Sequence, residues 1–144
     1  MVKTDAIKRL AELALAVLLV NGACDAAELI IANKACGFDQ IDRDSLKALF
    51  LGKKRFLPSG ESAEIILREN GVTHEAFLRD MLDESPSQFT TYWKRILFTG
   101  QGRTPITVVS DQEVIDEVAK HTNAIGYIDA GTPHADVTVI AITN

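Results

Sequence analysis

Residues 70–73 read Asn-Gly-Val-Thr and connect a predicted strand to a predicted helix, which is a place where a chain can hold an anion. The first turn of a helix presents backbone N–H groups without partners in the helix, together with a partial positive charge. Gly71 has no side chain, so a ligand can approach the backbone there, and the hydroxyl of Thr73 can donate a further hydrogen bond. The alternative interpretation is that Thr73 caps its own helix, the commoner use of such a residue.

The other reactive side chains form no catalytic or metal-binding pattern. His74, His121 and His134 lie far apart in the sequence and lack a zinc-type spacing such as H-E-x-x-H. Cys36 has no C-x-x-C partner, which indicates a buried or unreacted thiol. The sequence holds no nucleophile elbow, P-loop or dinucleotide fingerprint. We therefore predict that the protein is not an enzyme and uses neither a metal nor a cofactor.

The composition predicts one mildly acidic globular domain. The chain has 144 residues, of which 47% are hydrophobic and 24% are charged. Its 15 Lys and Arg residues against 20 Asp and Glu residues give a net charge of −5. This charge argues against a nucleic-acid partner, because binding to phosphates requires a basic surface. Two cysteines are too few for a disulfide-dense scaffold.

The first 26 residues have the three parts of a secretory signal peptide. Residues 1–9 are basic, residues 13–20 are an apolar core, and residues 21–26 are small or polar. The core is too short for a membrane-spanning helix, which needs about 20 apolar residues. Cleavage after Ala26 would leave a mature domain of residues 27–144.

Two alternatives stay open for this leader. Glu12 interrupts its apolar run, so the segment could instead be an amphipathic helix of a cytosolic protein. Acylation of Cys24 would make the protein a lipoprotein, although Asn21 stands where such signals usually have a small or aliphatic residue.

Beyond the leader, predicted strands alternate with predicted helices. Short apolar runs predict strands over residues 28–33, 63–67, 106–109, 124–128 and 137–142. Capping residues and a three-to-four spacing of apolar residues predict helices between Asp42 and Gly52, from Thr73 to Leu82, between Ser85 and Gly100, and from Ser110 to Val118. The Gly-Gln-Gly-Arg run at residues 100–103 follows a helix, so we interpret it as a helix end and turn. This order predicts an α/β domain with a mostly parallel or mixed sheet of four or five strands and helices on both faces.

Several pieces of the chain, taken together, carry a family resemblance. They are LIIAN at 29–33, SLKALFLGKK at 45–54, EAF at 75–77, YW at 92–93, FTGQG at 98–102 and NAIGYID at 123–129. This pattern resembles the periplasmic phosphate-binding-protein-like domains, which are substrate-binding components of ABC transporters. The resemblance runs from about residue 28 to residue 129. The helix that ends in F-L-G-K and the late A-I-G-Y-I-D are its most specific parts when taken together.

The resemblance implies a three-layer α/β lobe of the type II periplasmic-binding-protein-like fold, covering residues 27–144, and a periplasmic location. Full-length members have two such lobes that close on the ligand, whereas this chain has the length of one. In the phosphate binders the matching turn is of the type G-S-G-T, whose hydroxyl and N–H groups hold the oxyanion. Gly71 and Thr73 match in kind, but Val72 stands where a hydroxyl would help.

Two functions follow from this reading. The first is a secreted solute-binding-like protein that binds phosphate or another small oxyanion and works with a membrane transporter or envelope protein. Its candidate ligand-binding residues are Gly71, Thr73, His74, Arg68 and Arg103, the two arginines only if the fold brings them to the turn. The second is a non-catalytic interaction or accessory module that has lost ligand binding, in one version as a homo-oligomer of facing lobes.

Overall fold

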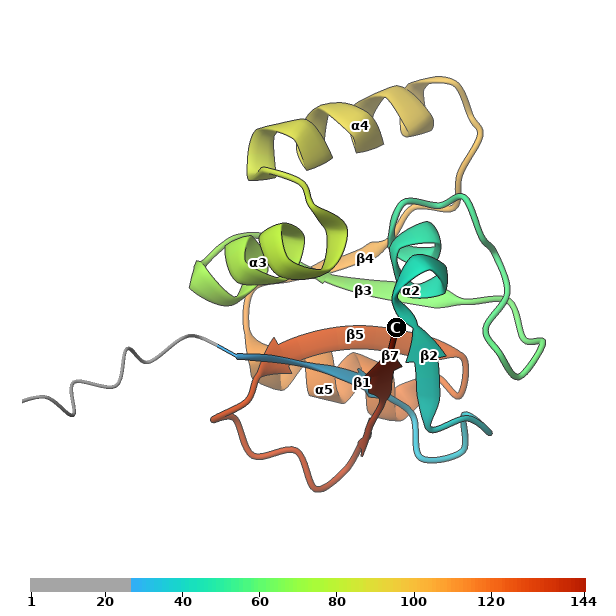
Figure 1. Cartoon of the computed structure of the whole chain (residues 1–144), viewed down its shortest axis with the longest axis vertical. Coiled ribbons are helices and arrows are strands. Elements are labelled where there is room, and N and C mark those ends of the chain that lie inside the picture. Colours follow the sequence, from blue (N-terminus) through green and yellow to red (C-terminus); the bar gives the residue numbers. More distant parts are fainter. Residues whose placement is uncertain (1–26) are drawn as a thin grey trace, which may run out of the picture.

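The structure of the protein is a computed structural model that describes residues 27–144 (Figure 1). The predicted signal peptide, residues 1–26, and the alternative lipidation at Cys24 lie outside the described residues. Both therefore stay predictions.

A five-stranded mixed sheet runs through the middle of the fold. Its strand order is β4 (Ile106–Val108), β3 (Glu64–Arg68), β5 (Ala124–Asp129), β1 (Glu28–Ala32) and β6 (Thr138–Val139). Strand β3 is parallel to both β4 and β5, whereas β1 is antiparallel to β5 and β6. Five of the six residues of β5 are buried, which explains why this central strand is an uninterrupted apolar run.

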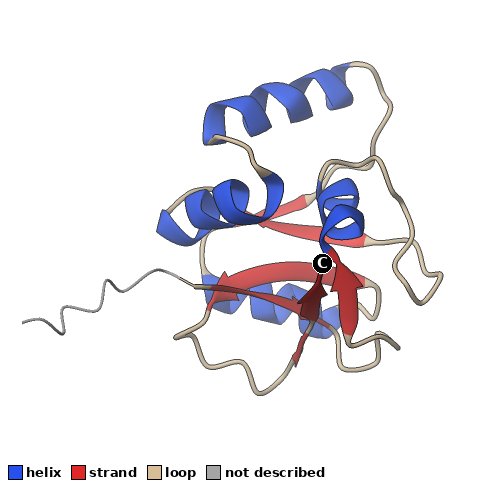
Figure 2. Ribbon diagram, in the orientation of Figure 1, coloured by secondary structure: helices blue, strands red, loops and turns tan. Residues whose placement is uncertain are grey.

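Helices cover both faces of the sheet and give three layers (Figure 2). Helix α5 (Asp111–Lys120) packs on one face, where its buried valines and isoleucine meet Ile31 and Ile66 of the sheet. The other face carries α2 (Arg43–Phe50), α3 (Val72–Phe77), the π-helical η2 (Leu78–Leu82) and α4 (Pro86–Phe98). Helix α4 lies farthest from the sheet in Figure 1 and buries Phe89 and Trp93. None of the helices described over residues 27–144 is both long enough and apolar enough to cross a bilayer.

Three helices begin where the sequence predicts a cap. The side chains of Asp42, Ser85 and Ser110 each accept a hydrogen bond from a backbone N–H in the first turn of α2, α4 and α5. Ser85 forms a full capping box with Gln88, and Pro86 occupies the first helical position. These local hydrogen bonds fix the residues at which the three helices begin.

The predicted strand 137–142 is in fact two short strands in different sheets. Strand β6 pairs with β1, whereas β7 (Ala141–Thr143) pairs in parallel with β2 (Gln40–Asp42), a strand that the sequence did not predict. The change occurs at buried Ile140, whose N–H donates to Ile30, while the next N–H, of Ala141, donates to Asp39. An apolar run alone does not show that its partner strand changes along its length.

Candidate functional site

Four of the five predicted site residues lie together at the carboxyl end of β3. Arg68 is the last residue of β3, Gly71 precedes α3, and Thr73 and His74 lie in the first turn of α3. We call these four residues the turn site. In open α/β sheets, ligands bind outside the carboxyl ends of the parallel strands, so the position itself suits a binding site.

Gly71 lets the backbone turn at a point where it lies next to the side chain of Arg68. Its backbone φ is +103°, a conformation that residues other than glycine rarely adopt. A Cβ at this position would lie 3.3 Å from Nη2 of Arg68. The first helical hydrogen bond of α3 runs from the N–H of Glu75 to the carbonyl of Gly71, at 3.0 Å. The N–H groups of residues 72–74 therefore have no partner within the helix.

The alternative role of Thr73 as a helix cap is wrong. The N-cap lies two residues earlier than predicted, at Gly71, and no side chain caps the helix. The hydroxyl of half-buried Thr73 makes no hydrogen bond within residues 27–144 and is free to bind a ligand. Its neighbour Val72 is 72% exposed, and its side chain is apolar.

Arg68 is held in place by an acid from the other face of the sheet. Its Nη1 pairs with Oδ1 of Asp111, the first residue of α5, and the two side chains are only 16% and 12% exposed. Asp111 also accepts hydrogen bonds from the N–H of Asp129 at 2.9 Å and from the hydroxyl of Thr132 at 2.7 Å. The Nε of Arg68 is buried without a partner among the described residues. Asp111 thus fixes the guanidinium and balances part of its charge, a role that the sequence did not reveal.

His74 is a buried neutral group rather than a cation. Its Nδ1 is hydrogen-bonded to the hydroxyl of Tyr127, which also accepts the N–H of Arg68 at 3.1 Å. The bond between the hydroxyl and Nδ1 forms with either tautomer of a neutral imidazole, because the hydroxyl can both donate and accept. Burial, with the positive charge of Arg68 in addition, lowers the pKa of His74 below its ordinary value. Burial raises the pKa of Tyr127, so its hydroxyl stays protonated as well.

A cavity of about 230 Å³ adjoins the turn site. Its charged and polar lining includes Arg68, His74 and Lys94, one acid, Glu69, and Thr107 of β4, and Trp93 of α4 also lines it. A water molecule takes up about 30 Å³ in the liquid, so this space can admit a small hydrated anion.

Arg103 does not lie with the other four residues. It precedes β4, and because β4 is parallel to β3, this position is at the amino-terminal end of β3. There its Nη1 lies 3.7 Å from Oε2 of Glu64, and its side chain is 69% exposed.

The remaining candidates have structural surroundings. Cys36 is buried, as predicted, and its thiol donates to the carbonyl of Phe38 at 3.1 Å. His121 lies 3.5 Å from Glu117, and Nδ1 of His134 lies 2.8 Å from the carbonyl of Thr132. Between residues 27 and 144, the structure places no group of three or more His, Cys, Asp or Glu side chains where they could hold a metal ion.

No protein-family model matches the chain, and neither does any curated protein. Solved structures do resemble it, among them an ABC-type phosphate transport receptor from Vibrio cholerae, with 16% identity and a TM-score of 0.61 over 80% of this chain and 45% of that one. PstS from Borrelia burgdorferi has 16% identity and a TM-score of 0.61, over 82% of this chain and 47% of that one. A putative phosphate ABC transporter substrate-binding protein with bound phosphate from Clostridium perfringens has 14% identity and a TM-score of 0.61, over 80% and 44% of the two chains.

At these identities the likeness shows the fold. The chain has the three-layer mixed α/β architecture of part of the phosphate transporter substrate-binding proteins, which confirms the predicted fold class and the resemblance on which it rested. The chain spans less than half the length of the solved structures that it matches.

Proposed function

We propose that this protein is a solute-binding-like protein that binds phosphate or a related small oxyanion at the turn site. The observation that carries the proposal is the position of Nη2 of Arg68 beside Gly71, next to the unpartnered N–H groups at the start of α3. The fold that the chain shares with phosphate-binding transport proteins supports the proposal.

The turn site offers the donors that an oxyanion requires. A guanidinium binds oxyanions through charge-assisted hydrogen bonds, and holding it rigidly in advance reduces the entropy lost on binding. Asp111 engages Nη1 of Arg68, so Nη2 is the edge that faces the turn. The hydroxyl of Thr73 adds a donor, whereas neutral His74 adds no charge and instead positions the backbone through Tyr127.

The expected affinity is modest. The charge of Arg68 is partly balanced by Asp111, and more than half of the length of the similar phosphate transport receptor has no counterpart in this chain. A site that stays open to water gains less from each charged contact than a closed one.

We further propose that the protein works outside the cytoplasmic membrane with a transporter or another envelope protein. The predicted leader supports this location, and the names of the similar structures as transport receptors support the partner.

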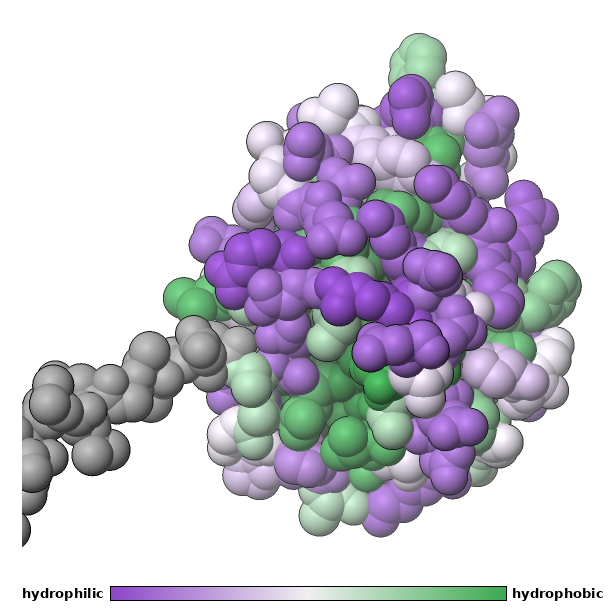
Figure 3. Space-filling view, in the orientation of Figure 1, coloured by the Kyte–Doolittle hydropathy of each residue, from purple (hydrophilic) through white to green (hydrophobic). Residues whose placement is uncertain are grey.

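A second candidate function is an interaction module without a ligand. Exposed apolar side chains favour it: Val72 at the turn itself is 72% exposed and Phe98 at the end of α4 is 94% exposed. Figure 3 also shows apolar side chains gathered over β1 and β7, below a belt of polar side chains. Under this hypothesis a partner, or a second copy of the chain, covers apolar surface and no anion binds. Light scattering at several protein concentrations tests self-association, and a monomer throughout excludes that version.

Thermal unfolding with and without millimolar phosphate tests the leading proposal. A ligand at 100 times its dissociation constant adds about 2.7 kcal/mol to the free energy of unfolding. Phosphate also stabilises proteins by exclusion from their surface, so the decisive comparison is between two variants. Thr73→Val removes a donor of the turn site and should reduce the stabilisation by phosphate, whereas Thr91→Val, the same change on an exposed part of α4, should not. Equal stabilisation of both variants by phosphate would contradict the proposal.

A further inference from the structure

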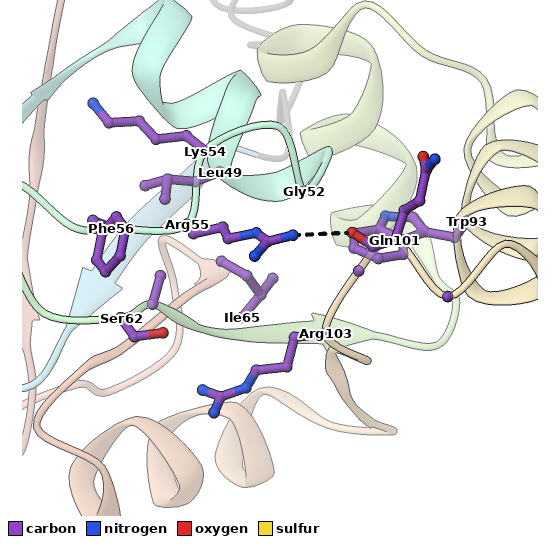
Figure 4. A pocket seen from close by; sticks show the side chains of 13 residues that line it. Leu49, Gly52, Lys54, Arg55, Phe56, Ser62, Ile65, Trp93, Gln101 and Arg103 are labelled. Atoms are coloured by element: carbon purple, nitrogen blue, oxygen red, sulfur yellow. Dashed lines mark hydrogen bonds between the residues drawn. The ribbon is translucent and has the colours of Figure 1, made fainter.

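A cleft of about 460 Å³ lies beside the amino-terminal end of β3, at the opposite end of that strand from the turn site. Its floor is apolar and is formed by Leu49 of α2, Ile65 of β3 and Trp93 of α4 (Figure 4). Leu49 and Trp93 are largely buried, whereas Phe56, which also lines the cleft, is 56% exposed. Pockets for small molecules commonly enclose about 300–1,000 Å³ and are lined mainly by apolar side chains with a few polar ones. The cleft has the volume of such a pocket, and its lining is more polar, with polar and apolar side chains in similar number.

Three cations surround this apolar surface: Lys54, Arg55 and Arg103. In Figure 4 the side chain of Arg55 extends across the cleft toward Gln101, and Arg103 lies on the other side of Ile65. We call the three cations and the apolar surface of Leu49, Ile65 and Trp93 the basic cleft.

The charges of the basic cleft are poorly balanced within the described part of the chain. Lys54 donates to the hydroxyl of Ser45 at 3.1 Å, and Arg55 donates to the carbonyl of Gln101 at 3.5 Å, and neither has a carboxylate within 4.0 Å. Arg103 has one such carboxylate, Glu64, at 3.7 Å. Three cations against one close acid is a local excess of positive charge in a chain whose net charge is −5.

Of the two unpaired cations, Arg55 is the better placed to bind an anion. Hydrogen bonds from Ser45 chiefly lower the pKa of Asp42, and Lys54 makes a further contribution, so part of the charge of Lys54 acts on that carboxylate. Arg55 extends over the apolar surface and has only a long contact with a carbonyl. Its guanidinium can therefore form charge-assisted hydrogen bonds with a bound anion.

Trp93 presents a fixed apolar face to the cleft. Its indole N–H donates to the carbonyl of Phe50 at 3.2 Å, and the side chain is only 8% exposed, so a ligand can meet only a small part of the ring. Two glycines lie against this ring: a Cβ on Gly52 would come within 3.1 Å of it, and one on Gly102 would come within 3.4 Å. The chain at Gly52 and at Gly102 thus packs against the ring, and neither residue has a side chain that would fill the cleft.

We propose that the basic cleft is a second binding site, for a small anion that carries an aromatic or aliphatic body. The anionic group lies between Arg55 and Arg103, and the body packs on the apolar surface beside Trp93. An inorganic anion would leave this surface without a partner, and a neutral molecule would leave the cations without one. The proposal is independent of phosphate binding, because the turn site and the basic cleft lie at opposite ends of β3. Among the described residues, Trp93 is the one that lines both the basic cleft and the cavity beside the turn site.

Nuclear magnetic resonance can test this site directly, because Trp93 is the single tryptophan of the chain and gives a single indole N–H signal. The protein is titrated separately with phenyl phosphate, inorganic phosphate and benzyl alcohol. Phenyl phosphate should shift the signals of the Trp93 indole and the Gly102 amide at concentrations at least about tenfold lower than the other two compounds. Because Trp93 also lines the cavity beside the turn site, the Gly102 amide decides the comparison. No shift of this amide with phenyl phosphate, or an equal shift with benzyl alcohol or inorganic phosphate, would overturn the proposal.

A pair of variants assigns the response to the cleft. Replacing both Arg55 and Arg103 by Gln should weaken binding of phenyl phosphate by about tenfold or more. Arg95→Gln is the matched control, because Arg95 lies on α4 with its guanidinium 5.5 Å from the ring centre of Tyr92 and does not line the cleft. Equal affinities in the double variant and the control would overturn the proposal. Thr73→Val should leave these shifts unchanged, so failure at one site does not imply failure at the other.

Discussion

The two ends of strand β3 use arginine in opposite ways. At the carboxyl end, Arg68 is mostly buried, paired with Asp111 and tied through its backbone to Tyr127. At the amino-terminal end, Arg55 and Arg103 lie at the surface of a cleft, and the nearest acid is a single glutamate at 3.7 Å from Arg103. The arginine at the carboxyl end therefore contributes to the stability of the fold, whereas the arginines at the amino-terminal end contribute little to it.

This difference separates stability from binding. A buried pair is costly to break because the remaining charge stays in a poorly solvated place, whereas an exposed pair contributes little. Substitutions of Arg68 or of its partner Asp111 should lower both stability and phosphate binding. Substitutions at the basic cleft should change ligand binding and leave the free energy of unfolding almost unchanged.

The largest expected effect is the loss of the buried acid. Asp111→Ala removes the partner of Arg68 and the acceptor for the N–H of Asp129, so we expect a loss of about 3–5 kcal/mol in the free energy of unfolding. Glu64→Ala, which removes the partner of exposed Arg103, should cost less than about 1 kcal/mol. Urea unfolding of both variants measures the comparison, and equal losses would refute it.

A smaller effect is expected from the tyrosine beneath the turn site. Tyr127→Phe leaves the N–H of Arg68 and the Nδ1 of His74 without their shared partner, at a cost of about 1–3 kcal/mol. Tyr92→Phe is the control, because that hydroxyl makes a single bond to the carbonyl of Leu51 in a partly exposed place. The control should lose less stability in the same urea measurement. A loss at Tyr92 that matched or exceeded the loss at Tyr127 would argue against a special role for the buried hydroxyl.

The smallest effect is a dependence of stability on pH. Burial lowers the pKa of His74 in the folded protein, so the unfolded chain binds more protons once the pH falls below about 6.5. The stability that neutral His74 contributes is present above that pH and is lost as the pH falls toward the folded pKa, by up to about 1.4 kcal/mol per pH unit.

His74→Asn should remove this dependence of the free energy of unfolding on pH. Unfolding measurements at several pH values between 7.5 and 5.5 give the slope for each variant. His121→Asn is the control, because that side chain is exposed at the end of α5 and should leave the slope in place. A slope that survives in His74→Asn would show that another group is responsible.

The sequence predicted the layers of the fold because its signals are local. Capping residues such as Ser85 and apolar runs such as β5 act over a few neighbouring residues, and the structure has them where they were expected. The split of residues 137–142 between β6 and β7 was missed because it depends on which distant strand each half meets.

The turn site was predicted only in part, for the same reason. Gly71 and Thr73 are recognisable from their place between a strand and a helix, whereas Asp111 lies 43 positions from Arg68 and Tyr127 lies 53 from His74. Arg103 could have been placed once β3 and β4 were known to be parallel, because it precedes one strand and Arg68 ends the other.

A titration with inorganic phosphate, followed residue by residue by nuclear magnetic resonance, tests the central claim most directly. If the turn site binds phosphate, the amide signals of Gly71, Val72 and Thr73 should shift and saturate together. The amide signal of Gly102, which lines the basic cleft but not the cavity beside the turn site, should change little at the same concentrations. Amide signals of residues 71–73 that do not move with phosphate would contradict the proposed function.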